Sequence, residues 1–392
     1  MEDVFVLSAV RTAIGKYGGG LASVPPCDLA ANVVREAISR SGVEPDAVGH
    51  LVFGNVIHTE VRDMYISRVA AINGGLNPGT PALTVNRLCG SGMQAIVSAS
   101  QAIMLGDCEV AVAGGAESMS RAPYWLPGMR WGQRMGDGTA LDPMVGALTD
   151  PFDACHMGVT AENVAADYHV SRADQDALAA ESHRRAAAAA AAGYFKEQIL
   201  PVEIPGKKGA TVVEVDEHVR SSVSIDDMAK LRPAFAKDGT VTAGNASGIN
   251  DAAAALVLAS ESFVTRSGLT PLGKLVGYAH AGVEPRIMGM GPVPATRKVL
   301  DRTGMKLDDI DVFEVNEAFA AQALAVAREL DLPPERTNPN GSGISLGHPV
   351  GATGAILAVK SLYELKRTGG RYALATMCIG GGQGIAAIFE RV

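Results

Sequence analysis

Cys89 is the residue of this chain whose type and surroundings best suit covalent chemistry. It lies in the segment 86–92, NRLCGSG, between an apolar run that predicts a strand and a periodic segment that predicts a helix. The first N–H groups of a helix are unpaired and carry partial positive charge, so they can lower the pKa of a thiol from its usual value of about 8.5. The flanking glycines let a substrate approach the backbone closely. Free cysteines more often pack as small apolar side chains, but this position favours a nucleophile that carries an acyl group.

His348 and Cys378 are candidates for moving protons around such a nucleophile. His348 stands in the glycine-rich segment 340–352, and histidine titrates in the range suited to taking a proton from a thiol. Cys378 lies where a predicted strand enters the turn 380–382, GGG, so its sulfur could face a cleft at the carboxyl end of that strand. Backbone N–H groups in the turn could stabilise an oxyanion. A structural histidine and a core cysteine are the alternative interpretations.

Asn316 and the segment 90–95 could also take part in binding or chemistry. Asn316 ends a predicted strand, where it could hold a water or donate to an oxyanion, although a turn or cap role would also fit. The segment 90–95, GSGMQA, matches the G-x-G-x-x-A form of a dinucleotide-binding fingerprint. The next predicted strand ends in glycines, where an acidic ribose ligand would be expected, and the unit is not at the first turn between a strand and a helix. Nicotinamide binding is therefore disfavoured.

Predicted strands and helices alternate at both ends of the chain. In the first part, strands are predicted at 4–9, 50–55, 82–86 and 110–113, and helices at 28–41 and 91–105. In the last part, we expect a helix leading into a strand at 251–259, helices at 294–303 and 351–367, and strands at 312–316 and 372–378. Such alternation predicts a mainly parallel sheet with helices on its faces.

The order of elements repeats between the two ends. The strand 48–55 resembles 310–316 with a slip of one residue, and each ends in Asn. Cys89 precedes the predicted helix of the first half, and His348 precedes the corresponding helix of the second. In a duplicated fold, the two helix starts would face each other across a pseudo-two-fold axis.

The middle of the chain differs from both ends. From residue 118 to 248 the pattern is irregular and interrupted by prolines, with a helix predicted at 172–192. We interpret this stretch as a large insertion over the core. It holds basic residues that could face an anion or could be scattered surface charges: Lys207, Lys208, Arg220, Lys230 and Arg232.

Composition excludes several classes of protein. The 392 residues carry a net charge of −8, which gives no support for nucleic-acid binding. The five cysteines are widely spaced without a CxxC pair, so we expect reduced thiols in a cytoplasmic compartment and neither a disulfide framework nor a metal site. The N-terminus does not match a signal peptide, and no apolar run is long enough to cross a membrane.

Together these motifs resemble the thiolase family, over the whole chain. The segments that carry the resemblance are 86–92 (NRLCGSG), 156–163 (HMGVTAEN), 244–247 (GNAS), 316–319 (NEAF), 347–351 (GHPVG) and 378–382 (CIGGG). The resemblance implies a thiolase fold of the α/β class, with two pseudo-symmetric halves in a five-layered αβαβα core and an inserted loop domain. It places the N-terminal half at 1–118 plus 249–271, the loop domain at 119–248 and the C-terminal half at 272–392.

The family's chemistry is a reversible Claisen condensation of acetyl-CoA with a short acyl-CoA. By resemblance, Cys89 becomes acylated while His348 takes its proton, and Cys378 then removes a proton from the methyl group of a second acetyl-CoA. One oxyanion hole would use His348 and a water held by Asn316. The other would use the backbone N–H groups of Cys89 and Gly380.

The resemblance also implies a binding site for CoA. Arg220 and Ser247 match positions that contact its nucleotide and pantetheine parts. The tunnel would be lined by Leu148, His156, Met157, Ala234, Phe235, Ala243, Met288, Ala318 and Phe319. Acyl-CoA and CoA would bind as substrates, without a permanently bound cofactor. Asp227 departs from a neutral residue that relatives can carry, which puts one nucleotide contact in doubt.

The stretch 120–146 matches the loop that joins thiolase dimers into a homotetramer, with neither a membrane nor a nucleic acid as a partner.

Two alternatives within the fold stay open. A ketosynthase-type condensing enzyme would use Cys with two His, or with His and Asn, and would depend on malonyl-CoA. A non-catalytic acyl-CoA binder would lack Cys89, His348 or Cys378, and this chain has all three. Crowding by Met288 and the loop around His156 favours short acyl chains.

Overall fold

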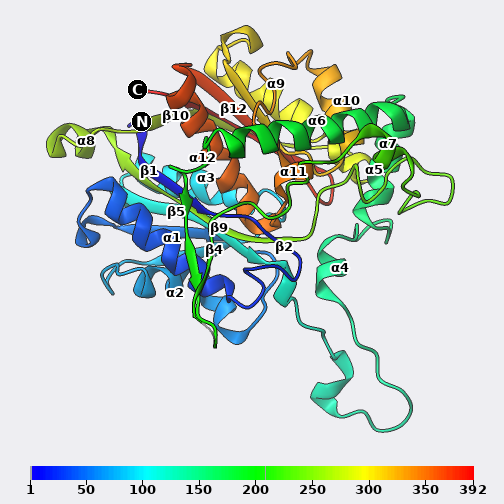
Figure 1. The fold of residues 1–392 in the computed structure, drawn as a ribbon. Coiled ribbons are helices and arrows are strands. Elements are labelled where there is room, and N and C mark those ends of the chain that lie inside the picture. The colour runs from blue at the N-terminus through cyan, green and yellow to red at the C-terminus, as the bar shows by residue number, and fades with distance from the viewer. Residues whose placement is uncertain (1, 208) are drawn as a thin grey trace.

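The computed structural model describes residues 2–207 and 209–392, built around one long mixed sheet (Figure 1). Its strands follow the order β11–β12–β13–β10–β1–β9–β5–β3–β4. They are β1 (Val4–Thr12), β3 (His50–Gly54), β4 (Ala82–Val85), β5 (Val110–Ser118), β9 (Asn250–Ser260), β10 (Gly273–Gly282), β11 (Val312–Val315), β12 (Tyr372–Ile379) and β13 (Gln383–Glu390). Two short strands pair with this sheet, β2 (Gly15–Lys16) and β6 (Ile199–Leu200), whereas β7 (Val202–Ile204) and β8 (Thr211–Val213) pair with each other.

The prediction of a mainly parallel sheet was wrong. Parallel pairing occurs at the two flanks, where β3 pairs with β4 and β5, and where β11 pairs with β12. The central strands β13, β10, β1, β9 and β5 are antiparallel. A strand that returns through a short turn pairs antiparallel without a crossover, and β12 reaches β13 through the turn at Gly380–Gly382.

The helix predicted at the start of 251–259 was also wrong, because β9 is a strand throughout Asn250–Ser260, whereas the strand predicted to follow that helix is part of β9. Alanine is a strong helix former, and four alanines stand at 252–255. Here β9 pairs with β1 on one side and β5 on the other, and all its residues are buried. The hydrogen bonds of two neighbouring strands outweigh local propensity, and the small side chains let α1 and α12 pack against β9.

The N-terminal strands of the sheet lie between an outer layer of α1 and α2 and a middle layer of α3 and α12. The C-terminal strands lie between this middle layer and α9, which packs on β10 and β13, so the core has five layers. The helix bounds are α1 (Pro26–Ser41), α2 (Ile66–Asn73), α3 (Ser91–Met104), α4 (Pro143–Ala147), α5 (Met157–Asp167), α6 (Arg172–Ala191), α7 (Ile225–Ala229), α8 (Glu261–Ser267), α9 (Pro292–Thr303), α10 (Ala320–Glu329), α11 (Gly343–Leu346) and α12 (Val350–Thr368).

The two middle helices approach each other at glycines. A β-carbon on Gly354 of α12 would lie 2.3 Å from the backbone nitrogen of Met93 in α3. A β-carbon on Gly92 would lie 2.6 Å from the nitrogen of Ala355. Because these neighbours are backbone atoms that cannot move aside, glycine is required for α3 and α12 to touch near their first turns. This contact brings the residues that precede the two helices into one region.

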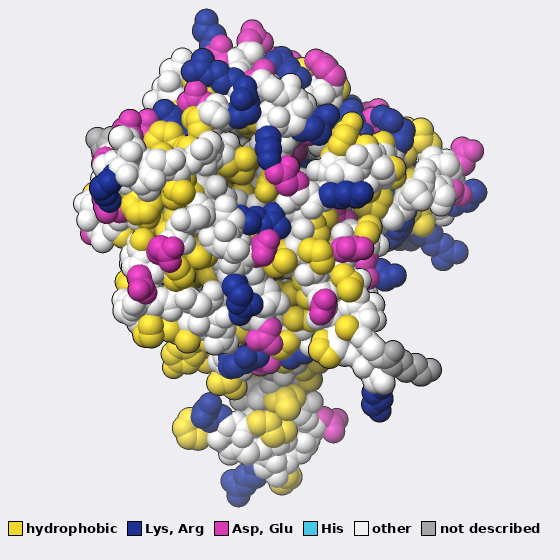
Figure 2. Space-filling view, turned by 60° about the vertical axis from the view of Figure 1, so that its left-hand side comes forward, with side chains coloured by type: hydrophobic (Ala, Val, Ile, Leu, Met, Phe, Trp, Pro, Cys, Tyr) yellow, Lys and Arg dark blue, Asp and Glu magenta, His cyan; other side chains and the backbone are white. Residues whose placement is uncertain are grey.

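The stretch between β5 and β9 lies over this core. Its helix α6 crosses the C-terminal half in Figure 1, and an arm (residues 123–142) projects away from the body. Two hydrogen bonds between the backbones of Trp125 and Leu141, each 2.8 Å, close the base of the arm. Figure 2 shows apolar side chains on the arm's surface, and Trp131 is 90% exposed. Among the described residues, no helix is long and apolar enough to cross a membrane.

Candidate active site

A cavity of about 700 Å³ lies where the two middle helices begin and the inserted stretch covers the core. Every predicted site residue except Asn316 lines it: Cys89, Leu148, His156, Met157, Arg220, Ala234, Phe235, Ala243, Ser247, Met288, Ala318, Phe319, His348, Cys378 and Gly380. These residues come from segments up to about 290 positions apart in the chain. The fold therefore gathers two thiols and one imidazole into a single cavity.

Cys89 stands on a tight corner between β4 and α3. Leu88 before it has a φ of 44°, an uncommon conformation for a residue other than glycine. The Ser91 hydroxyl holds the corner, accepting from the N–H of Arg87 at 2.9 Å and donating to the carbonyl of Leu88 at 2.7 Å. A β-carbon on Gly90 would lie 2.6 Å from the side chain of Ile379. The corner thus seats Cys89 against the end of β12.

The expected lowering of the Cys89 pKa was wrong. Burial raises the pKa of this thiol to about 11, although hydrogen bonds from the N–H groups of Gly380 and of Cys89 itself lower it in part. The N-cap of α3 is Gly90, so Cys89 stands one position outside the helix. Loss of water around the sulfur outweighs the dipole of the helix. A base is therefore needed to deprotonate Cys89 at neutral pH.

His348 has the properties of that base. Its side chain is buried, and burial lowers the pKa of the imidazole to about 4, so the ring is neutral at neutral pH. Its backbone N–H donates to Oδ1 of Asn250 at 2.9 Å, and Nδ1 lies 2.6 Å from Oγ1 of Thr353. Nε2 lies 3.4 Å from Nδ2 of Asn316. The ring is consequently held in one orientation at the cavity.

Cys378 is buried at the end of β12, beside Cys89. Burial, and secondarily the neighbouring charge of Cys89, raise the pKa of the Cys378 thiol above its usual range. In the turn that follows, Gly380 packs against the end of the Met157 side chain, since an added β-carbon would lie 2.9 Å from its Cε. A thiol with a raised pKa becomes a strong base once it has lost its proton.

Asn316 lies behind the cavity lining, with its side chain beside His348. Its Oδ1 is buried and has no hydrogen-bond partner among residues 2–207 and 209–392. A buried, unpaired amide oxygen of this kind suits an ordered water. Asn316 is therefore placed to act together with His348.

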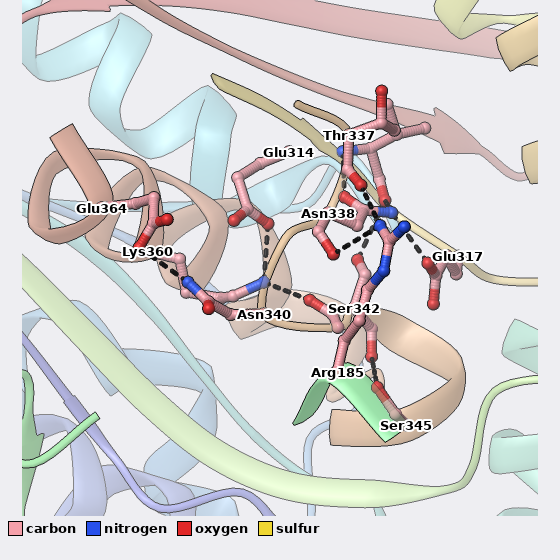
Figure 3. A network of polar contacts seen from close by, with 12 residues as sticks. Arg185, Glu314, Glu317, Thr337, Asn338, Asn340, Ser342, Ser345, Lys360 and Glu364 are labelled. Carbon is pink, nitrogen blue, oxygen red and sulfur yellow. Dashed lines mark hydrogen bonds and ion pairs between the residues drawn. The ribbon is translucent and has the colours of Figure 1, made fainter. Parts of the chain in front are cut away.

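A buried polar network lies between the end of β11 and the loop 338–348 (Figure 3). Nζ of Lys360 lies 2.6 Å from Oε2 of Glu314 and donates to the carbonyl of Gly341, also at 2.6 Å. Oδ1 of Asn338 accepts a hydrogen bond from the N–H of Val315 at 2.8 Å, and Nδ2 of Asn338 donates to Oε1 of Glu317 at 2.8 Å. The network joins the end of β11, which precedes Asn316, to the loop 338–348, which ends at His348.

The outer cavity has an aromatic wall. The His156 ring stacks on Phe235, with 4.7 Å between centroids, and Phe235 meets Phe319 edge-to-face at 6.1 Å. Nδ1 of His156 accepts from the N–H of Gly158 at 3.0 Å and so caps α5. A β-carbon on Gly158 would lie 2.2 Å from the Phe235 ring, so this contact requires glycine. The stacked rings of His156 and Phe235 are therefore held in a fixed orientation.

Several lining residues were not predicted from the sequence. Lys16, Tyr17, Glu217 and His218 also face the cavity. The Glu217 carboxylate accepts from the backbone N–H groups of Lys16 and Gly20, each at 3.1 Å, and pins the turn between them. The glycine-rich segment 15–20 after the first strand was a signal that could have indicated this turn.

Glu117, a buried residue, was also not predicted from the sequence. Its carboxylate accepts from Val56 N–H at 3.1 Å, Ile57 N–H at 3.0 Å and Gly351 N–H at 2.8 Å. Burial raises the pKa of this carboxyl group to about 8. Glu117 therefore couples the N-terminal half to the first turn of α12, next to His348.

The basic residues of the inserted stretch do not act as one group. Arg220 lines the cavity, whereas Lys230 pairs with Asp227 at 3.2 Å, and Lys208 lies outside the described residues. Asp227 also accepts from the Ser224 hydroxyl at 2.7 Å, so its carboxylate is engaged locally. Within residues 2–207 and 209–392, no three His, Cys, Asp or Glu side chains are grouped as metal ligands would be.

Comparisons with known proteins identify the family of this chain. The family model for the thiolase N-terminal domain matches residues 4–262, and that for the thiolase C-terminal domain matches residues 269–391. The chain therefore belongs to the thiolase family, a family of acyltransferases, and the predicted α/β thiolase fold is confirmed.

Individual relatives show which thiolases this chain is similar to. Beta-ketothiolase BktB of Cupriavidus necator is 64% identical over 392 residues, covering 100% of both chains. An acetyl-CoA acetyltransferase of Chromobacterium violaceum is 50% identical over 99% of this chain and 100% of its own. The crystal structure of the Bacillus anthracis acetyl-CoA acetyltransferase matches with a TM-score of 0.98 and 47% identity, covering 100% of this chain and 99% of that chain. Human mitochondrial 3-ketoacyl-CoA thiolase in complex with CoA matches with a TM-score of 0.96 and 44% identity, covering 100% and 98%.

Proposed function

We propose that this protein is an acetyl-CoA acetyltransferase of the β-ketothiolase type, which transfers an acyl group through Cys89 in a reversible Claisen condensation. The observation that carries the proposal is the meeting of Cys89, His348 and Cys378 in one cavity. A nucleophile, its base and a second base are the groups that the reaction needs. The presence of Cys378 as the second base favours this reaction over that of a ketosynthase-type enzyme.

In the first half-reaction, the Cys89 sulfur attacks the thioester carbonyl while its proton passes to Nε2 of His348. A thiol of pKa about 11 and an imidazole of pKa about 4 are both neutral at rest, so proton transfer accompanies the attack. The carbonyl oxygen becomes an oxyanion facing the N–H groups of Cys89 and Gly380. CoA leaves as a thiolate and takes its proton from Cys378.

In the second half-reaction, the Cys378 thiolate removes a proton from the methyl carbon of another acetyl-CoA. Protonated His348, with a water on Asn316, stabilises the enolate oxygen. The new carbon nucleophile attacks the acyl-Cys89 carbonyl, the carbon–carbon bond forms and the carbon–sulfur bond breaks. Cys89 then recovers its proton from His348, so acid and base groups return to their starting states.

The remaining lining residues are proposed to bind the thioester. The aromatic wall of Phe235, His156 and Phe319 suits the apolar parts of pantetheine, and Ser247 and Arg220 offer hydrogen bonds and positive charge towards the mouth. Leu148, Met157, Ala234, Ala243, Met288 and Ala318 complete the wall. The CoA complex of the human relative supports CoA as the ligand. Because Met288 is buried against this wall, we expect short acyl chains to be preferred.

Assembly and organisation complete the proposal. We infer a homotetramer in which the arm contacts another dimer, since Trp131 and Met135 on it are about nine-tenths exposed. We also infer the division into 1–118 plus 249–271, 119–248 and 272–392, because β9 pairs with β1 and β5. The need for two reduced thiols suits a cytoplasmic location.

Cys378→Ser tests the division of labour between the two cysteines. Serine is a much weaker acid, so the variant should still become acylated at Cys89 but should form no acetoacetyl-CoA. Mass spectrometry after mixing with acetyl-CoA reads the first step, and absorbance of the product enolate reads the second. Normal condensation by Cys378→Ser would refute the proposed base.

Thiolysis rates for 3-oxoacyl-CoA substrates of increasing length would test the preference for short chains.

A further inference from the structure

We propose that Thr353 is the positioning residue that holds the His348 imidazole in the tautomer protonated at Nδ1, so that Nε2 carries the lone pair that takes the proton of Cys89. The inference rests on the proposed function. It concerns a residue five positions beyond His348, on the first turns of α12, that does not line the cavity.

The contact between the two side chains is short and shielded from water. Oγ1 of Thr353 lies 2.6 Å from Nδ1 of His348, and both residues are at least 95% buried. The backbone N–H of His348 is separately bound to Asn250. Thr353 is therefore the described partner that acts on the Nδ1 side of the ring.

The proton of the hydroxyl group decides which way this hydrogen bond runs. A threonine hydroxyl has one proton and two lone pairs. Oγ1 of Thr353 donates that proton to the carbonyl of Pro349, at 2.9 Å. Oγ1 must then accept from His348, which places a proton on Nδ1.

The other side of the ring agrees with this assignment. Nδ2 of Asn316 lies 3.4 Å from Nε2 of His348, and an amide NH₂ can only donate. Nε2 is therefore the acceptor in this contact, on the edge of the ring opposite Thr353. Two contacts on opposite edges of the ring select one tautomer.

The tautomer matters because the resting ring is neutral. A neutral imidazole has one basic nitrogen, and only a ring with its lone pair at Nε2 can accept the Cys89 proton. When Nε2 becomes protonated, Nδ1–H still donates to Thr353, so the hydroxyl needs no rearrangement during the step. Without this contact the ring could rotate or change tautomer, and a fraction of the molecules would lack a base facing Cys89.

Thr353→Val is the variant that tests this role, because valine keeps the shape and removes the hydroxyl. We expect the rate of acyl-enzyme formation, read as the burst of CoA release, to fall about 10- to 100-fold with little change in the KM for acetyl-CoA. Thr353→Ser should restore most of the rate. The matched control is Thr296→Val, which removes a buried helical hydroxyl that has no hydrogen-bond partner in the described part of the chain and should leave the rate unchanged.

Nitrogen NMR of histidine-labelled protein tests the tautomer without any substrate, with the His348 signals assigned from their loss in His348→Asn. Wild type should show Nδ1 protonated and Nε2 unprotonated, and Thr353→Val should lose this preference. Protonation at Nε2 in the wild type, or an unchanged burst in folded Thr353→Val, would overturn the inference. A wild type that forms no acyl-enzyme would refute the proposed function instead, while the NMR result would still decide the role of Thr353.

Discussion

Two corners of the same kind meet at the cavity, yet they carry opposite chemical roles. Cys89 precedes α3 in the N-terminal half, and His348 precedes α12 in the C-terminal half. The Cys89 side chain is partly open to the cavity, whereas His348 is buried, with its backbone N–H and both ring nitrogens facing partners. This difference shows that a strand–turn–helix corner determines only where the residue lies. Burial and hydrogen-bond partners then decide whether the residue there gives up a proton or receives one.

The largest expected effect is at the first corner. Cys89→Ala should abolish covalent labelling by radiolabelled acetyl-CoA, because alanine has no nucleophile. Cys108→Ala, which changes a half-buried cysteine that does not line the cavity, should label as wild type does. Labelling of Cys89→Ala at the wild-type level would mean that the acyl group is carried elsewhere.

The second corner should have the next largest effect. His348→Ala should slow acylation by about 10²- to 10⁴-fold, the usual contribution of a general base. The residual rate should rise with pH towards the thiol pKa of about 11, because hydroxide then replaces the missing base. In the wild type, protonation of His348 should remove activity only as pH falls towards about 4, well below the usual histidine range.

These pH profiles sharpen the comparison between the two corners. Burst measurements of CoA release across pH would give both curves. An acidic limb in the wild type near the usual histidine pKa of about 6.5 would show that burial does not control His348 as argued. A pH-independent residual rate in His348→Ala would contradict the raised pKa of Cys89.

The support behind the second corner can be broken without touching the cavity. Lys360→Met leaves the Glu314 carboxylate buried without its ion pair and should cost about 3–5 kcal/mol of unfolding free energy. Lys366→Met on the same helix removes an exposed pair with Glu197 and should cost about 0–1 kcal/mol. Urea unfolding of both variants measures the contrast, and equal costs would argue against a stabilising role for the network.

The smallest expected effect concerns the contact between the two corners' helices. Gly354→Ala forces a β-carbon against the backbone nitrogen of Met93, which should cost about 1–3 kcal/mol of stability. Gly138→Ala on the arm, where no atom lies closer than 4.0 Å to the added carbon, should be near neutral. Thermal unfolding compares them, and unchanged stability of Gly354→Ala would show that α3 and α12 can separate freely.

Local pattern was sufficient for many elements. The helices predicted at 28–41 and 172–192 end within one or two residues of α1 and α6, because apolar spacing and a glycine stop are local signals. The direction of the sheet and the strand β9 were missed. Both depend on which distant segment supplies the hydrogen bonds, and alanine-rich sequence alone indicates a helix.

The candidate site divides in the same way. Residue type and neighbouring glycines singled out Cys89, His348 and Cys378, and the resemblance supplied the tunnel residues that the cavity brings together. Glu117 and Thr353 carried no local signal strong enough to identify them. Their roles arise from contacts with Gly351 and His348, which a one-dimensional pattern does not reveal.

The sequence by itself determined which reactive groups are available and which local conformations surround them, because side-chain chemistry and turn propensity are properties of short segments. Only the tertiary structure decided that the Cys89 thiol holds its proton more tightly than a free thiol and that His348 is neutral at rest. A pKa depends on how much water is excluded and on which dipoles face the group, and both come from segments far away in the chain.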